Sequence, residues 1–285
     1  QMHGLVALDA EDKVIRPAIL WNDARTSAEV DYLNNEIGKP ALANASGNIA
    51  FAGFTAPKLL WMRNNEPEAF ARIKRIMLPK DYINYLLTGV HATEFSDAAG
   101  MLLVDVKNKC WSKELIDACG IDESTLPDVL PTGARVGTIL PSVAKELGVS
   151  ENVQIVIGSH DQIVNALGAG VQNVGDAVDT SGTCECITPL FASIPASLDF
   201  QKNNFACVPY LEERGFVTYA YNISAGSVVR WYRDALSEHL SEEAKRQNKS
   251  IYRLLDEQGP TEPTNLLALP FLQGMGGTPD VDANA

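Results

Sequence analysis

Short apolar runs of strand length alternate along this chain with segments of helical spacing. In the clearest case, the apolar run 154–157 ends at Gly158, and Asp161 then opens a helical segment that reaches Ala169. Strands that alternate with helices over a whole chain indicate an α/β fold. Because the carboxyl ends of strands carry the active residues in such folds, we expect chemistry between Gly158 and Asp161.

Cap and turn residues predict the other elements. We expect a hairpin over 5–15, and a helix that Thr55 caps, with Pro57 in its first turn. The irregular stretch 120–141, with its prolines and glycines, leads to a domain boundary that we place between 1–153 and 154–285. Further helices are expected over 25–37 (stopped by Gly38), 81–87 (closed by Gly89), 112–118, 142–147 (ended by Gly148), 227–236 and 242–255, and strands over 76–78, 154–157 (of the buried type), 177–179, 184–189, 205–210 and 216–221.

The charge balance excludes some partners. The formal net charge is −13, from 23 Lys and Arg against 36 Asp and Glu, so we expect neither nucleic acid nor an anionic membrane as a partner. No apolar run is long enough to span a bilayer. The five cysteines match no disulfide framework, and Cys184 and Cys186 lack a second Cys/His pair for a metal site. This usage is typical of a reducing cytoplasm.

Two candidate sites lie in the first 25 residues. His3 sits beside a glycine at the edge of a strand-like run, where its imidazole is either structural or a hydrogen-bonding partner for a polyol hydroxyl. The string ILWNDAR at 19–25 is either an Asn/Asp helix cap with a buried Trp, or a polar wall in which Trp21 is the apolar face.

Two more candidates lie in the second half. Asp161, in the string GSHDQ at 158–162, is either an N-cap or a carboxylate that accepts a proton from an attacking hydroxyl. The string DTSGT at 179–183 is either an ordinary hairpin turn or a loop that holds phosphates through backbone N–H groups. The chain contains neither a Walker loop nor GxGxxG.

Taken in this order, these segments resemble the FGGY carbohydrate kinases, and the resemblance covers nearly the whole chain. The first half resembles the xylulose kinases of that family more closely. GSHDQ, DTSGT and SAGSVVRW (224–231) fit the family more generally. The strings that carry the closer resemblance are QMHGLVALD (1–9), RPAILWNDAR (16–25), GFTAPKLLW (53–61), LPKDYINYLLTG (78–89) and SDAAG (96–100).

The resemblance implies an actin-like fold of two ribonuclease-H-like domains, with a sugar deep in the cleft between them and Mg²⁺-ATP mainly on the second. Asp161 is then the general base that deprotonates a sugar hydroxyl, and Gln162 beside it contacts the sugar, as do Met2 and His3. The family's second phosphate loop falls on Gly182 and Thr183, and a helix start that borders the nucleotide falls on Gly226, with Arg230 one turn further. The expected protein is a cytoplasmic enzyme that converts D-xylulose to D-xylulose 5-phosphate. A homodimer is one possible assembly.

Two departures from the family pattern accompany the resemblance. The chain starts after the family's opening DxGT hairpin and stops before its glycine-rich adenosine-binding segment, and Met275 and Gly276 replace the usual charged pair near the end. We therefore expect a piece of a longer protein that is catalytically incomplete by itself. Alternatives are a related kinase for ribulose, fuculose, gluconate or glycerol, or a sugar-binding regulator without transfer activity.

Overall fold

The structure is a computed structural model, and it forms two compact units. It describes residues 2–194, 200, 203, 205–211, 214–222, 224–262 and 264–267. The first unit comprises 1–178 with 188–218, and the second comprises 179–187 with 219–285. The expected boundary between 153 and 154 stays a prediction. Met275 and Gly276 lie outside the described residues.

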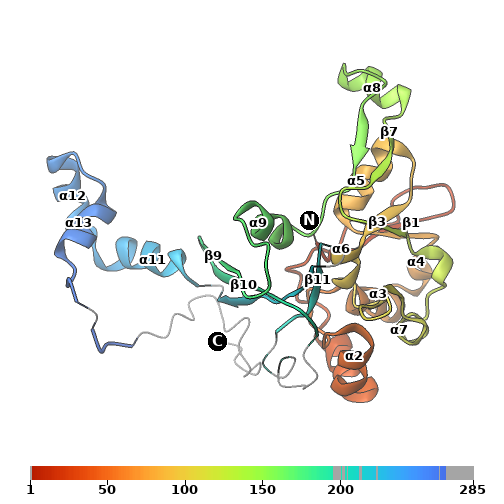
Figure 1. Ribbon diagram of the computed structural model, residues 1–285, viewed down its shortest axis with the longest axis horizontal. Helices are drawn as coiled ribbons and strands as arrows, with labels where there is room; N and C mark the ends of the chain where they lie inside the picture. The colour runs from red at the N-terminus through yellow and green to blue at the C-terminus, as the bar shows by residue number, and fades with distance from the viewer. Residues whose placement is uncertain are drawn as a thin grey trace. The chain divides into compact units, whose positions relative to one another are not determined.

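The core of the first unit forms around β1 (Val6–Leu8), which is buried along its whole length and pairs antiparallel with β2 (Arg75–Met77). Bridges from Leu8 to Val14 and from Leu5 to Ile19 bring the expected hairpin back along β1. Helices α3, α5, α6 and α7 gather around β1 and β3 (Figure 1). Their bounds are α3 (Thr55–Asn65), α4 (Pro67–Ala71), α5 (Pro79–Thr88), α6 (Phe95–Ala99) and α7 (Lys113–Cys119).

Some helices end where the sequence predicts, and others do not. Gly89 closes α5 and Gly148 closes α8 (Pro141–Leu147), each in the left-handed conformation, as expected. The expected helix 25–37 is instead α1 (Ser27–Tyr32) followed by a π-helical turn, η1 (Leu33–Gly38). Gly38 ends η1, but helical structure resumes at once in α2 (Lys39–Ser46). Pro40 lies in the first turn of α2, where its missing N–H costs no intrahelical hydrogen bond.

A buried strand leads directly into a short helix at the centre of the first unit. β3 (Ala92–Glu94) is fully buried, pairs in parallel with β6 (Asp128–Leu130), and continues without a loop into α6. The smaller pieces nearby are β4 (Val104–Asp105), β5 (Cys110–Trp111) and the 3-10 turn η2 (Glu123–Thr125). This junction places the small residues of α6 inside the core.

The expected strand 154–157 forms, but it is not of the buried type. β8 (Gln154–Val156) pairs antiparallel with β7 (Arg135–Thr138) as a two-stranded sheet. Val156 is 54% exposed, and only Ile157, just after the strand, is buried, because a two-stranded sheet covers little of either face. The strand still leads through Gly158 into α9 (Asp161–Gly168), as expected.

Two of the later expected elements are each divided in two in the structure. The expected strand 216–221 is two strands, β12 (Gly215–Val217) and β13 (Ala220–Asn222), and the expected helix 242–255 is α12 (Glu238–Gln247) and α13 (Ile251–Gln258). Asn248 breaks that helix in the left-handed conformation, which Asn tolerates better than most residues. The other elements are β9 (Ala177–Ser181), β10 (Glu185–Phe191), β11 (Val208–Tyr210) and α11 (Gly226–Leu236).

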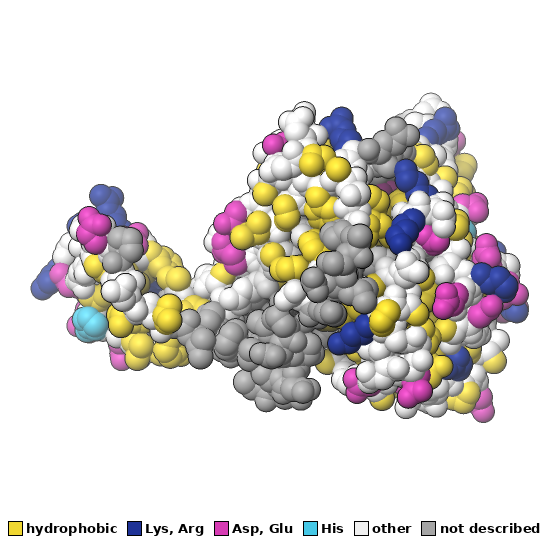
Figure 2. Space-filling view, turned by 60° about the horizontal axis from the view of Figure 1, so that its bottom comes forward, with side chains coloured by type: hydrophobic (Ala, Val, Ile, Leu, Met, Phe, Trp, Pro, Cys, Tyr) yellow, Lys and Arg dark blue, Asp and Glu magenta, His cyan; other side chains and the backbone are white. Residues whose placement is uncertain are grey.

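Two observations concern nucleic acids and membranes as partners: the distribution of charged side chains on the surface, and the length and hydropathy of the helices. In the view of Figure 2, acidic and basic side chains are interspersed rather than gathered by sign. Within the described part of the chain, no helix is both long and apolar enough to cross a membrane.

A buried amide joins two distant segments of the first unit. Asn48 accepts a hydrogen bond from the backbone N–H of Cys207 at 2.8 Å and donates to the carbonyls of Cys207 and Ser46 at 3.0 and 2.9 Å. The Asn48 amide thus pairs with both backbone groups of Cys207, as a neighbouring peptide group would, and Cys207 directly precedes β11.

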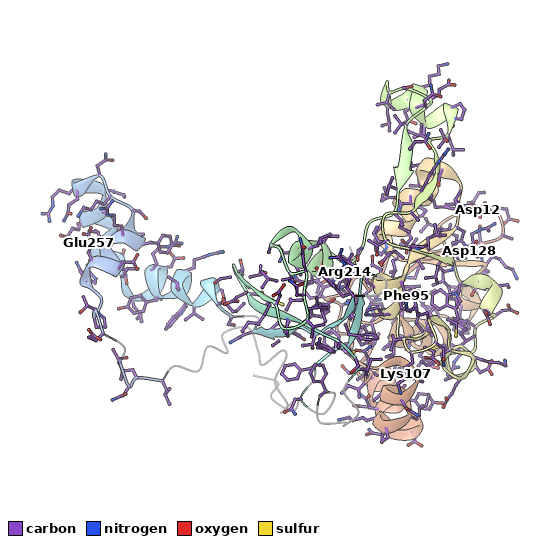
Figure 3. The ribbon with its side chains drawn as sticks, viewed as in Figure 1. Asp12, Phe95, Lys107, Asp128, Arg214 and Glu257 are labelled. Atoms are coloured by element: carbon purple, nitrogen blue, oxygen red, sulfur yellow. The ribbon has the colours of Figure 1, made fainter. Side chains whose placement is uncertain are left out.

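Replacing Asn48 with Ala should destabilise the protein by about 2–3 kcal/mol, because it leaves buried N–H and C=O groups without partners. Urea unfolding would measure this loss. Asn44→Ala is the matched control, because Asn44 is exposed and bonds Lys107, which Figure 3 labels. Equal effects of the two substitutions would contradict the assigned role of Asn48.

Candidate functional site

His3 holds a backbone conformation that is uncommon for a residue with a side chain. Its φ angle is +60°, in the left-handed region. Two hydrogen bonds fix it there: Thr55 Oγ1 donates to the His3 carbonyl at 3.0 Å, and the His3 ring bonds the Gly100 carbonyl at 3.1 Å. Thr55 therefore does not cap α3 as expected, and Phe54 occupies the cap position. Strain of this kind concentrates at functional sites.

The same contacts determine the charge and tautomer of His3. Burial, followed by the neighbouring His160 and Lys58, holds the pKa of His3 well below its ordinary value, so the ring is neutral. A carbonyl only accepts, so Nδ1 carries the proton that is donated to Gly100. Nε2 is then an acceptor. Gly100 has to be glycine, because a Cβ there would collide with the His3 ring.

A buried lysine organises the loop beside His3. Lys58, on α3, is 0% exposed, and its ammonium donates to the carbonyls of Ala52 at 3.1 Å, of Phe54 at 2.9 Å and of Gly53. Burial lowers the pKa of Lys58 to about 7, against the opposing charge of Asp23. The fixed loop places the Phe54 ring edge-on to His3, with 5.1 Å between centroids.

His160 brings the 158–162 segment to His3. The two imidazole rings lie 5.3 Å apart, centroid to centroid. His160 occupies the cap position of α9, where its Nδ1 lies 3.1 Å from the Gln162 N–H. The capping interpretation of Asp161 was therefore wrong: Asp161 is the first helical residue, and the cap is the side chain before it.

Asp161 is accessible and paired with His160. Its side chain is 61% exposed, and Oδ1 lies 3.1 Å from His160 Nδ1. Partial burial raises the pKa of Asp161, but the hydrogen bond and charge of His160 outweigh this and lower it overall. Nδ1 cannot both accept from Gln162 and donate to Asp161, so the proton on His160 decides which contact is a hydrogen bond. Asp161 is thus an ionised carboxylate open to a ligand.

Further polar groups are buried around this pair. Lys80 lies 2.6 Å from Asp81 Oδ1 and 3.3 Å from Asp97 Oδ2. Burial raises the pKa of Asp97 to about 6, against the charges of Lys80 and His160. Asp97 Oδ1 and Gln162 Oε1 are buried and have no hydrogen-bond partner among the described residues. Among the described residues, these two oxygens are acceptors without a donor.

The 19–25 segment lies against the same loop, but it is not a cap. α1 begins at Ser27, and no side chain caps it. Asp23 instead receives two hydrogen bonds from the Arg25 guanidinium, at 2.8 and 2.7 Å, and this bonding holds the pKa of Asp23 low. Trp21 is 48% exposed, and its carbonyl lies beside Gly53. Met2 is partly buried, and its carbonyl accepts the Gly4 N–H at 2.7 Å.

The predicted nucleotide residues come together within the second unit. The Gly226 N–H donates to the Gly182 carbonyl at 2.9 Å, and the N–H groups of Ala225 and Ser227 donate to the Thr183 carbonyl. A Cβ on Gly226 would collide with Gly182, which explains the glycine. The Gly182 N–H itself donates to Cys184, and Arg230 is exposed on α11. The phosphate-binding role of this loop stays a prediction.

Within the described ranges, no group of three or more His, Cys, Asp and Glu could hold a metal ion. We assign no residue of this chain to Mg²⁺.

Of the sequence candidates, His3, Asp161 and Gln162 come together around the His3–His160 ring contact. Lys58, Lys80 and Asp97 were missed, although charged residues within otherwise apolar strings (TAPKLLW, LPKDY, SDAAG) are a signal for them.

Comparisons with known proteins give consistent results. Residues 1–168 match the family "FGGY family of carbohydrate kinases, N-terminal domain". The xylulose kinase of Lactococcus lactis subsp. lactis (strain IL1403) is 38% identical over 244 residues, 85% of this chain and 47% of that protein. The crystal structure of a xyloylose kinase from Brucella ovis has a TM-score of 0.82 at 32% identity, covering 100% of this chain and 56% of its own.

A gluconate kinase from Lactobacillus acidophilus has a TM-score of 0.87 at 24% identity, covering 100% of this chain and 56% of its own, which shows the fold alone. These likenesses confirm the expected actin-like α/β fold. The chain spans about half the length of the curated relatives it matches.

Replacing Lys58 with Met should remove a pH dependence of stability. Below pH 7, Lys58 is charged in both folded and unfolded chains and contributes no slope. Above pH 7 the unfolded chain holds a proton that the folded chain has lost, so the unfolding free energy rises with pH, by up to about 1.4 kcal/mol per unit. Unfolding between pH 7.5 and 9.5 should show about 2 kcal/mol of this rise in wild type and none in Lys58→Met. Lys113 is exposed, so Lys113→Met should show the same rise as wild type. If the unfolding free energy of wild type and both variants depends on pH in the same way, Lys58 does not have this role.

Proposed function

This chain belongs to the FGGY family of carbohydrate kinases, and from that premise we propose that its protein transfers the γ-phosphoryl group of ATP to a sugar hydroxyl, with D-xylulose as the sugar. The observation that carries the proposal is the pairing of a neutral His3 with the His160–Asp161 segment in one place. The names of the similar proteins support the choice of sugar.

A polyol needs acceptors for its hydroxyl groups, and the site supplies them. His3 Nε2 is an acceptor because Nδ1 donates to Gly100. Gln162 Oε1 is a buried acceptor without a partner among the described residues, so a ligand hydroxyl would satisfy it. The Phe54 ring and the apolar face of Trp21 would border the carbon skeleton, and Met2 adjoins His3.

Asp161 has the properties of a general base in this reaction. Its carboxylate is ionised at neutral pH and exposed enough to meet a hydroxyl. As the sugar oxygen forms its bond to the γ-phosphorus, its proton passes to Asp161, and the bond from that phosphorus to the bridging oxygen breaks to release ADP. Phosphoryl transfer depends mainly on such positioning and on charge neutralisation.

The nucleotide belongs to the second unit in this proposal. The turn at Gly182 and Thr183 and the start of α11 at Gly226 would border ATP, with Arg230 one turn along the helix. Mg²⁺ would arrive with the phosphates and neutralise their charge. A coupled ADP assay over a panel of ribulose, fuculose, gluconate, glycerol and xylulose tests the choice of sugar, and a higher kcat/KM for another compound would overturn it.

Asp161→Asn in the full-length protein should lower kcat by at least about 10²-fold, the usual scale of general-base catalysis, because the amide cannot take the proton. The substitution is nearly isosteric and lies at an exposed position, so the unfolding midpoint should stay unchanged. The coupled ADP assay measures the effect, and turnover near the wild-type rate would refute Asp161 as the base.

His3→Asn should raise the KM for the sugar by about ten-fold and leave the KM for ATP nearly unchanged, because one hydrogen bond to the sugar is lost. Asn tolerates the left-handed backbone, and its amide can still donate to Gly100. Steady-state kinetics with each substrate varied in turn give both constants. If the two KM values rise together, His3 has a structural role instead.

A further inference from the structure

The hydroxyl of Ser96 is the centre of a buried hydrogen-bond network in the first unit. Ser96 lies in α6, next to Phe95, which Figure 3 labels. Its Oγ is 2.6 Å from Glu94 Oε2, 2.6 Å from Ser159 Oγ and 3.1 Å from the His160 backbone N–H. Glu94, Ser96 and Ser159 are all buried.

The direction of each hydrogen bond follows from what each atom can do. A carboxylate oxygen only accepts, so the Ser96 hydroxyl donates to Glu94. Its single proton is then used, so Ser159 must donate to Ser96 Oγ, as the His160 N–H does. The Ser96 oxygen therefore makes three hydrogen bonds and has no capacity left. This arrangement fixes the oxygen in one position.

Glu94 is the common acceptor that orients the network. Besides Ser96, it receives the Thr132 hydroxyl on Oε1 at 2.6 Å and the Asp97 N–H on Oε2 at 3.3 Å. Thr132 bonds Oε1 and Ser96 bonds Oε2, so the contribution of Thr132 is separable from that of Ser96. The carboxylate thus links β3, α6 and the loop after β6.

The network ends on the two residues before Asp161. The contacts of Ser96 with Ser159 and His160 join residues 63 and 64 positions apart and fix the backbone where the chain turns into α9. The His160 ring then lies against His3 and within 3.1 Å of the Asp161 carboxylate. Because Asp161 itself is exposed, the preceding loop sets its position.

We propose that Ser96, oriented by Glu94, is a positioning residue that holds the 159–160 backbone and so directs the Asp161 carboxylate toward the sugar hydroxyl. The proposal rests on the function proposed above. Ser96 touches neither the sugar nor ATP. Its loss should lower kcat and loosen the loop without weakening ATP binding.

Three variants of the full-length protein test the proposal. Ser96→Ala removes the central hydroxyl, Ser96→Thr keeps it, and Thr132→Val removes a different donor to the same Glu94 carboxylate as the matched control. Hydrogen–deuterium exchange of the peptide around His160 reports on the loop directly, because the His160 N–H donates to Ser96. The coupled assay gives kcat and both KM values.

In Ser96→Ala we expect exchange at His160 to accelerate about ten-fold and kcat to fall between about ten- and a hundred-fold, the scale for misplacing a catalytic group by about 1 Å. The KM for ATP should stay within about two-fold, and Ser96→Thr should restore both readouts. Thr132→Val should leave both unchanged. If Ser96→Ala does not fold, Ser159→Ala removes one donor to Ser96 and should show the same pattern to a smaller degree.

Exchange at His160 that matches the Thr132→Val control would overturn the proposal, as would faster exchange with an unchanged kcat. Absence of sugar-dependent ADP release in wild type contradicts the proposed function instead. In that case the base-directing role of Ser96 fails with it, while the exchange measurement still decides whether Ser96 holds the loop.

Discussion

The hydrogen bond between His3 Nδ1 and the Gly100 carbonyl is the contact on which the rest of the site depends. It joins residues 97 positions apart and fixes the tautomer of a buried ring. The left-handed backbone at His3, the missing side chain at Gly100 and the hydroxyl of Thr55 are all conditions for it. From a neutral His3 follow an acceptor at Nε2 and a close approach of His160.

Burial explains why the two lysines near this contact have several hydrogen-bond or ion-pair partners each. An unpaired polar atom inside a protein costs more than a typical hydrogen bond contributes, so each buried charge needs partners. Lys58 has three carbonyls, and Lys80 has two carboxylates. Among the described residues, the buried acceptors left without a partner include Asp97 Oδ1 and Gln162 Oε1. A ligand rich in hydroxyl groups is the kind of molecule that would satisfy Gln162.

Local sequence determined the elements whose ends carry their own signal. Gly89 and Gly148 end helices because glycine takes the left-handed conformation at little cost, and Asp161 opens α9 after a short strand. The signals failed where neighbours in space took over. Thr55, an expected cap, bonds His3 instead. The expected buried strand at 154–157 is largely exposed because, among the described residues, one other strand alone pairs with it.

The sequence by itself determined the α/β class, the resemblance of its ordered strings to one kinase family, and His3, Asp161 and Gln162 as candidates. Only the tertiary structure decided which residues act together. Ser96 and Ser159, or His3 and Gly100, have no spacing that reveals their contact, because desolvation and hydrogen bonding depend on which distant segments pack together. The capping role of His160, the charge of His3 and the network on Glu94 are therefore properties of the packed chain.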